Sequence, residues 1–225
     1  MSDNEWMRIQ AETLYVLDGH TILGINEPGH QPSAPLVFVG RTRTDAHRYF
    51  RADLPQALIE EIHRLTRADL NIVQLCRALR TYQEVSRIWI GPAYSIPQLA
   101  FPAEDSSICL IGESDRHVLD RFFRSVNEQY AYRSPVVAVV DQGHAVSVCC
   151  SARKSNRAIE ASLYTVEAYR GKGLAGRLVP LWSAEVRQLG YHPLYSTSWD
   201  NLHSQKVAQR LGMVQYGVDL SLSAE

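Results

Sequence analysis

Residues 166–176 read Val-Glu-Ala-Tyr-Arg-Gly-Lys-Gly-Leu-Ala-Gly, with glycines at positions 171, 173 and 176. An apolar run at residues 159–166 enters this loop as a predicted strand, and apolar residues at helical spacing leave it over residues 174–188. Backbone N–H groups that converge at the start of a helix bind phosphate oxygens, because the positive end of the helix dipole lies there. Arg170 and Lys172 add positive charge. The loop therefore predicts a site for a phosphate-bearing ligand, whereas the glycines alone would also fit a plain turn.

Two well-known phosphate loops fit this segment less well. The loop lacks the Gly-Lys-Ser/Thr ending of a P-loop. It also comes late in the chain, without the parallel strands of a dinucleotide-binding fold. Neither of these two fold classes is expected.

The segments on both sides of the loop predict an α+β domain. Upstream lie an apolar run at residues 108–111, a helical segment at residues 114–126 with Ser114 as its candidate N-cap, and a hairpin of residues 136–140 and 145–150. Downstream lie a strand at residues 194–197, a helix at residues 201–211 that ends at Gly212, and a strand at residues 214–222. This order predicts a mixed, mostly antiparallel central sheet flanked by helices.

Residues 1–104 carry no motif of known chemistry. Apolar residues recur at helical spacing over residues 54–79, and residues 88–94 read as a strand that ends in a turn. Prolines punctuate the following segment, which places a domain boundary near residue 104. We therefore expect an N-terminal α/β region over residues 1–104, or a degenerate second half of the same fold, followed by the main domain at residues 105–225.

The loop resembles the signature of the GNAT superfamily of N-acetyltransferases, Arg/Gln-x-x-Gly-x-Gly/Ala. Arg170, Gly173 and Ala175 occupy the specified positions. Residues 199–213, which read Trp-Asp-Asn-Leu-His-Ser-Gln-Lys-Val-Ala-Gln-Arg-Leu-Gly-Met, are similar to the family's Asn-x-x-Ala/Ser helix that ends in Leu-Gly-Phe. The resemblance covers residues 105–222, and it implies the GNAT-like fold and the use of acetyl-coenzyme A (acetyl-CoA).

The resemblance also implies which residues hold acetyl-CoA. The pyrophosphate would sit on the loop, and the pantetheine arm would pair with the backbone of the preceding strand at Thr165 and Val166, a form of strand addition. Asn201 would contact the pantetheine from the next helix, with a helix N-cap as its alternative role. The implied cofactor-binding residues are Thr165, Val166, Arg170, Gly171, Lys172, Gly173, Leu174, Ala175, Gly176 and Asn201.

Attack of an amine on a thioester needs a neutral nucleophile, a polarised carbonyl and a proton for the leaving thiolate. Glu160 is the only carboxylate inside the strand before the loop and resembles the family's base, although a register shift of one residue would give it a surface or salt-bridge role. Ala208 stands where many relatives carry a Tyr as the acid, so that residue is not available here. Ser204, one turn after Asn201 on the same helix face, resembles the thiolate proton donor of the ribosomal-protein subgroup. Helix packing is the alternative role of Ser204.

These residues predict an N-acetyltransferase that moves an acetyl group from acetyl-CoA to a primary amine by direct attack in a ternary complex. We expect a small-molecule amine as the acceptor, with residues 1–104 shaping its site, whereas a protein N-terminus or lysine is an alternative acceptor. The absent Tyr keeps a second class of function open, an acyl-CoA-binding module that senses the cofactor or regulates a partner without turnover. A domain that has lost cofactor binding is the third alternative, which the intact loop disfavours.

The composition limits the binding partners and the cellular location that we expect for the protein. A formal net charge of -1, from 23 basic and 24 acidic residues, predicts no nucleic-acid partner and no anionic membrane surface. The N-terminus lacks a signal-peptide pattern, and no apolar segment approaches the roughly 20 residues of a spanning helix, so a cytoplasmic location is expected. Monomer and homodimer both fit the sequence.

The four cysteines Cys76, Cys109, Cys149 and Cys150 show no metal-ligand spacing, so no metal site is predicted. We expect all four to be reduced packing residues. Because neighbouring side chains of a strand point to opposite faces, the adjacent pair is expected to divide between the two sides of a sheet.

Overall fold

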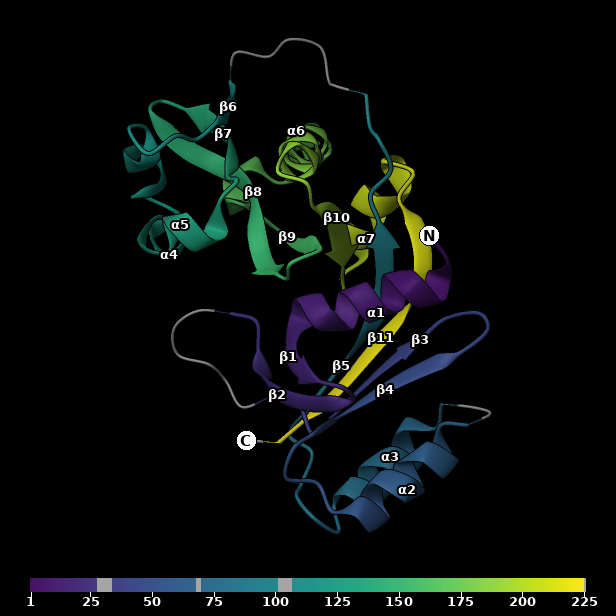
Figure 1. The fold of residues 1–225 in the computed structure, drawn as a ribbon. Helices are drawn as coiled ribbons and strands as arrows, with labels where there is room; N and C mark the ends of the chain where they lie inside the picture. The colour runs from purple at the N-terminus through teal and green to yellow at the C-terminus, as the bar shows by residue number, and fades with distance from the viewer. Residues whose placement is uncertain (28–33, 68–69, 101–106, 225) are drawn as a thin grey trace. The chain divides into compact units, whose positions relative to one another are not determined.

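The structure is a computed structural model that describes residues 1–27, 34–67, 70–100 and 107–224. Its internal contacts divide the chain into two units (Figure 1). Unit 1 comprises Met1–Ala93, Thr197–Asn201 and Gln215–Glu225, and unit 2 comprises Tyr94–Ser196 and Leu202–Val214. The predicted domain boundary near residue 104 lies outside the described residues and stays a prediction.

The sheet of unit 2 contains the strands that surround the glycine loop. They are β6 (Ile108–Leu110), β7 (Val137–Asp141), β8 (His144–Lys154), β9 (Ala158–Thr165) and β10 (His192–Ser196). They lie in the order β10-β9-β8-β7-β6, and all neighbours are antiparallel except β9 and β10, which are parallel. This arrangement confirms the predicted α+β fold with a mixed, mostly antiparallel sheet.

Strands β7 and β8 form the hairpin that the sequence predicts. Asp141 pairs with His144, so two residues make the turn, with φ of 48° at Gln142 and 76° at Gly143. Two consecutive left-handed residues are typical of a type I′ turn, whose twist matches that of the strands it joins. Gly143 adopts this conformation without strain because it has no Cβ.

Helices cover both faces of the unit 2 sheet. They are α6 (Leu174–Gln188), α7 (Leu202–Arg210), α4 (Arg124–Glu128), α5 (Tyr130–Arg133) and the 3-10 turn η1 (Arg116–Leu119). Residues of α6 and α7 belong to one buried apolar cluster, and residues of η1 and α4 belong to a second. Cys149 lies in the first cluster and Cys150 in the second, which confirms that the adjacent cysteines face opposite sides of β8.

The predicted continuous helix over residues 114–126 is wrong. The structure divides this segment into η1 and α4, and the Ser114 hydroxyl donates to Asp115 Oδ2 at 3.1 Å instead of capping a helix. The Arg116 guanidinium donates to Oδ1 and to the carbonyl of Asn127 at 2.5 and 2.6 Å. In a straight helix these two residues would lie about 16 Å apart, at a rise of about 1.5 Å per residue. The contact therefore requires the break.

Unit 1 contains a sheet in the order β1-β2-β4-β3-β11-β5. Its strands are β1 (Tyr15–Asp18), β2 (Thr21–Ile25), β3 (Val37–Arg41), β4 (Ala46–Arg51), β5 (Arg87–Ser95) and β11 (Val214–Ser223), the last two of which extend beyond unit 1. Figure 1 shows α1 (Asp3–Leu14) on one face of this sheet, and α2 (Gln56–Leu65) and α3 (Ile72–Leu79) on the other. The helices predicted over residues 54–79 and the strand at residues 88–94 are thereby confirmed.

Close backbone approach brings α1 onto its sheet. A Cβ at Gly40 would lie 2.2 Å from Met7 Sδ, so a larger residue there would force the Met7 side chain to move. On the same face the Tyr216 hydroxyl donates to Gln10 Oε1 at 2.8 Å, and Gln10 Nε2 donates to Asp219 Oδ2 at 3.0 Å. These three side chains are buried, and they connect α1 to the C-terminal strand β11.

Candidate active site

The glycine loop joins β9 to α6 through the 3-10 turn η2 (Glu167–Tyr169). Gly171 and Gly173 have φ of 77° and 74°, in the left-handed region that glycine adopts readily. Gly173 is the N-cap of α6, so the N–H groups of Leu174 and Ala175 have no carbonyl one turn earlier in the helix to bond, whereas the Gly176 N–H donates to the Gly173 carbonyl at 3.1 Å. Gly171 and Gly173 are exposed, and a Cβ at either would meet no atom within 4 Å. The loop thus presents backbone donors to open space, which fits a pyrophosphate.

The polar side chains of the loop bond to neighbouring elements of unit 2. Arg170 Nε donates to the carbonyl of Thr165 at 3.2 Å, and Lys172 Nζ lies 4.6 Å from the centroid of the Tyr169 ring. The Tyr169 hydroxyl donates to Asp141 Oδ2 at 2.7 Å, and this hydrogen bond raises the pKa of Tyr169. The loop is therefore connected to the end of β9 and to the β7–β8 hairpin.

Strand β9 has one partly open edge. Its pairing with β10 runs from Ala158 to Glu160, opposite His192 to Leu194, and no further pair is recorded in the described part of the chain. On its other edge β9 stays paired with β8 as far as Thr165, opposite Ser147. The edge of β9 nearest the loop is therefore available for an extended ligand.

Thr165 and Val166 differ in their main-chain bonds. The Val166 N–H donates to the carbonyl of Val146 at 2.9 Å, and the Val166 carbonyl accepts from the Tyr169 N–H at 2.8 Å. Since backbone groups of successive strand residues alternate between the two edges, the groups of Thr165 face the open edge. The Thr165 hydroxyl shares a hydrogen bond of 2.7 Å with the hydroxyl of Ser147. Of the two, Thr165 has the backbone that a ligand along this edge would meet.

Glu160 lies in β9 and is 5% exposed. Its Oε1 accepts a hydrogen bond from the Ser196 hydroxyl of β10 at 2.5 Å. Its neighbours Ile159 and Ala161 pack into the apolar cluster of α6 and α7. Because side chains alternate along a strand, Glu160 points to the opposite face of the sheet.

Ser204 lies inside α7, and its carbonyl accepts from the Tyr195 hydroxyl at 3.5 Å. Burial raises the pKa of Tyr195 to about 12, so this hydroxyl remains a donor at neutral pH. Tyr195 and Ser196 are consecutive in β10 and point to opposite faces, so Glu160 and Ser204 flank β10 from opposite sides. The structure therefore does not bring the candidate base and acid onto one face of the sheet.

Asn201 directly precedes α7 and is exposed. Its N–H donates to the Ser198 carbonyl at 3.1 Å. The segment before it runs beside β5, since the Trp199 N–H donates to the Ile90 carbonyl at 3.0 Å. A Cβ at Gly91 would lie 1.8 Å from the Thr197 carbonyl oxygen, so this approach requires glycine.

A pocket of about 360 Å³ lies beside the end of β9 in unit 2. Thr165, Val166 and Arg170, which the sequence singles out, form part of its wall. Glu167, which belongs to the loop segment 166–176, also lines the pocket, and the remaining lining residues, which no motif identified, are Phe122, Phe123, Ser125, Val126, Arg133, Cys150 and Tyr164. The aromatic side chains come from the η1–α4 segment and from β9, so their proximity depends on tertiary structure.

The described residues lack two further classes of feature. None of their helices is long and apolar enough to cross a membrane. Nor do they contain a group of three or more His, Cys, Asp and Glu side chains that could hold a metal ion.

The fold and the loop together define an α+β domain with a glycine-rich loop at a helix N-terminus. The GNAT acetyltransferase family model matches residues 105–217, which is half of the chain, and the protein belongs to this family. A search of curated proteins found no relative with significant sequence similarity.

Solved structures share the fold at low sequence identity. An acetyltransferase of the GNAT family from Colwellia psychrerythraea is 12% identical with a TM-score of 0.53, over 98% of this chain and 95% of its own. A GCN5-related N-acetyltransferase-like protein from Streptococcus suis 89/1591 is 16% identical with a TM-score of 0.52, over 84% of each chain. At such identities the likeness concerns the fold alone.

Proposed function

We propose that this protein is an acetyl-CoA-dependent N-acetyltransferase that acts on a primary amine of a small molecule. One observation carries the proposal: two left-handed glycines precede the N-terminus of α6, and they follow the end of β9, where no pairing with β10 is recorded in the described residues. The first feature suits a pyrophosphate, and the second suits an extended pantetheine arm. Family membership supports the same activity.

Within the loop, the backbone N–H groups of residues 171–175 would hold the pyrophosphate, with Arg170 and Lys172 as counter-charges. The N–H groups of Arg170 and Gly176 already donate to the carbonyls of Glu167 and Gly173. The backbone of Thr165 would pair with the pantetheine arm. Val166 would contribute its side chain, because both of its main-chain groups already bond within the protein. Asn201 would add an amide that both donates and accepts.

Acetyl-CoA supplies the activated acetyl group. Glu160 is the proposed base that removes a proton from the acceptor ammonium, and the Ser196 hydroxyl orients its carboxylate. Ser204 is the proposed donor of a proton to the departing thiolate. Since the two side chains belong to opposite faces of the sheet, they would meet one substrate only where β9 and β10 are no longer paired, beyond Leu194.

The acceptor would occupy the pocket beside β9. Its volume of about 360 Å³ suits a small molecule, and pockets of this class usually lie between about 300 and 1,000 Å³. Glu167 in its wall would attract the ammonium group, whereas the two arginines of the wall, Arg133 and Arg170, already donate to protein carbonyls. Phe122 and Tyr164 would cover an apolar body. These features favour a small amine over a protein terminus.

Thiol release from acetyl-CoA in the presence of a panel of small primary amines tests this proposal. We expect turnover with at least one apolar or aromatic amine, and a Glu160→Gln variant that binds acetyl-CoA but turns over about 10²–10⁴-fold more slowly. Ser196→Ala is the matched control, since it removes only the orienting hydroxyl and is expected to cost less. Tight binding of acetyl-CoA without thiol release from any amine would favour a sensor module over an enzyme.

A further inference from the structure

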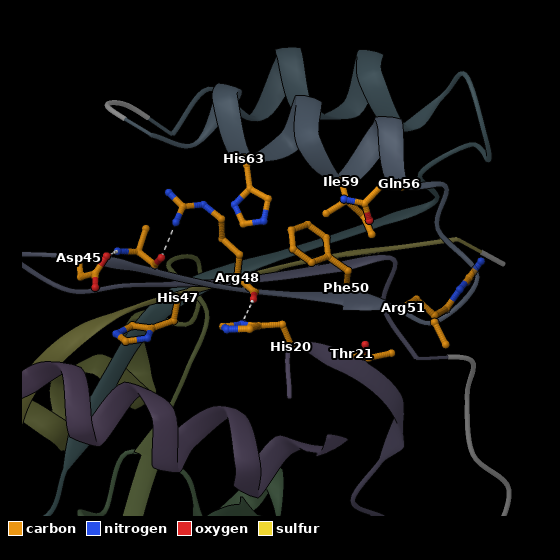
Figure 2. A pocket seen from close by; sticks show the side chains of 12 residues that line it. His20, Thr21, Asp45, His47, Arg48, Phe50, Arg51, Gln56, Ile59 and His63 are labelled. Atoms are coloured by element: carbon orange, nitrogen blue, oxygen red, sulfur yellow. Dashed lines mark hydrogen bonds between the residues drawn. The ribbon is translucent and has the colours of Figure 1, made fainter. Parts of the chain in front are cut away.

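A second pocket lies in unit 1, between α2 and the edge of β4 (Figure 2). Its volume is about 390 Å³. The side chains that line it include three imidazoles, His20, His47 and His63, and one carboxylate, Asp45. Together with Arg48 and Arg51, side chains that can carry a positive charge thus outnumber carboxylates in a concave site, which is typical of a site that binds an anion.

Two imidazoles reach this pocket from different elements. Figure 2 shows His63 extending from α2 toward β4, and His20 beside the β4 backbone. The His20 Nδ1 donates to the Arg48 carbonyl at 3.0 Å, which fixes the ring and leaves Nε2 as its second nitrogen. The His63 ring packs on Phe50 with centroids 5.1 Å apart, and no hydrogen bond to this ring is recorded within the described segments. The His63 ring can therefore donate to a ligand, whereas His20, whose Nδ1 proton is already donated, can donate from Nε2 only as an imidazolium.

Arg48 places a fixed positive charge in the same pocket. Its guanidinium donates to the Ala46 carbonyl and to both the hydroxyl and the carbonyl of Thr66, which positions it between β4 and the end of α2. A guanidinium has five N–H groups, so these three bonds leave capacity for a ligand. Arg51 adds less net positive charge to the pocket, because the carboxylate of Asp53 lies 2.6 Å from its guanidinium and offsets it.

Burial and neighbouring positive groups lower the pKa values of two pocket histidines, His63 and His47. Burial lowers the pKa of His63, and the nearby Arg48 and His20 lower this pKa further. Burial also lowers the pKa of His47, which Asp45 raises and which Arg8, His20 and Arg48 lower. An anion bound among these groups would offset the repulsion between their positive charges and would therefore favour the protonated imidazoles.

We propose that this pocket binds a small oxyanion ligand, with a phosphate or carboxylate group held by His20, His63 and Arg48. Phe50 and Ile59 line the same pocket and would cover an apolar or aromatic part of that ligand. All of its lining residues belong to unit 1, so the site is distinct from the glycine loop of unit 2.

Binding would be coupled to proton uptake. Because the anion stabilises the imidazolium forms, its affinity is highest at acidic pH and is lost as pH rises through the histidine pKa values of the complex. Uptake of one proton changes the dissociation constant by up to tenfold per pH unit. We expect binding about 10- to 100-fold weaker at pH 8 than at pH 6.

Sulfate and benzoate are suitable probes, because neither changes its own charge over this pH range. The affinity of each is measured at both pH values by calorimetry, and the His63 and His20 ring resonances are followed by NMR. At least one probe is expected to bind, with a raised apparent pKa for His63. The tighter probe indicates whether the natural ligand carries a phosphate-like or a carboxylate group.

The variants His20→Gln and His63→Gln retain a hydrogen-bonding side chain but cannot become charged. Each is expected to weaken binding at pH 6 by about tenfold and to reduce the pH dependence. His117→Gln, an exposed histidine of unit 2, is the matched control and should bind as the wild type does. Absence of binding by both probes, equal affinity at the two pH values, or unchanged affinity in both pocket variants would overturn the proposal.

Discussion

Replacing Gly173 by alanine measures the cost of the left-handed backbone in the loop. Residue 173 has φ of 74°, and an added Cβ meets no atom within 4 Å, so the substitution strains the backbone without a clash. An L-residue in this region costs roughly 1–2 kcal/mol. For a chain of 225 residues, that loss corresponds to a melting temperature lower by about 2–8 °C.

Gly176→Ala is the matched control, since residue 176 lies two positions into the same helix and has equally open surroundings. Its backbone is not left-handed, and alanine favours a helix over glycine by up to about 1 kcal/mol. Thermal unfolding followed by circular dichroism should therefore separate the two variants, with Gly173→Ala below the wild type and Gly176→Ala equal to it or above. The reverse order would refute the loop conformation described above.

Three further outcomes are expected. Gly91→Ala should destabilise the protein by about 2 kcal/mol or more in urea unfolding, because its Cβ would lie 1.8 Å from the Thr197 carbonyl oxygen. The control Gly112→Ala, whose Cβ has its nearest contact at 3.4 Å, should cost much less. Equal effects of the two substitutions would contradict the close approach of Gly91 to Thr197. Burial raises the pKa of Cys150 to about 12 and that of Cys149 well above its usual value, so both thiols stay protonated at pH 8. Both should react with a thiol reagent only above that pH or after unfolding. Fast labelling of either cysteine in the native protein at pH 8 would contradict their burial. Ser204→Ala should slow turnover more than it weakens acetyl-CoA binding, and an unchanged kcat would remove Ser204 from the mechanism.

Elements with local signals in the sequence could be predicted. Helix α6 begins and ends where the sequence places it, because a glycine loop precedes it and apolar spacing defines its length. Helix α1 gave no such signal, since its buried face includes Gln10 and Thr13. The partners of Gln10 are Tyr216 and Asp219, which lie more than 200 positions along the chain. No local pattern reveals such a pairing.

The candidate site likewise contains residues that a local sequence motif identifies and residues that only the tertiary structure brings together. The loop residues are contiguous, so a motif could identify them together. The orientation of Glu160 depends instead on its pairing with Leu194 and on the Ser196 hydroxyl, which only the tertiary structure supplies. The aromatic wall of the pocket beside β9 follows from the break between η1 and α4, where the sequence predicted one helix.

Calorimetric titration with acetyl-CoA and with acetyl-pantetheine tests the central claim, that the loop at α6 holds the pyrophosphate. The wild type should bind acetyl-CoA much more tightly, because acetyl-pantetheine lacks the pyrophosphate together with the 3′-phosphoadenosine attached to it. Gly173→Glu should lose this preference through like charge, and Gly173→Lys, which imposes the same backbone strain, should retain more of it. The two Gly173 variants isolate the part of this preference that comes from the loop. Failure of the wild type to bind acetyl-CoA, or an unchanged preference in Gly173→Glu, would contradict the account.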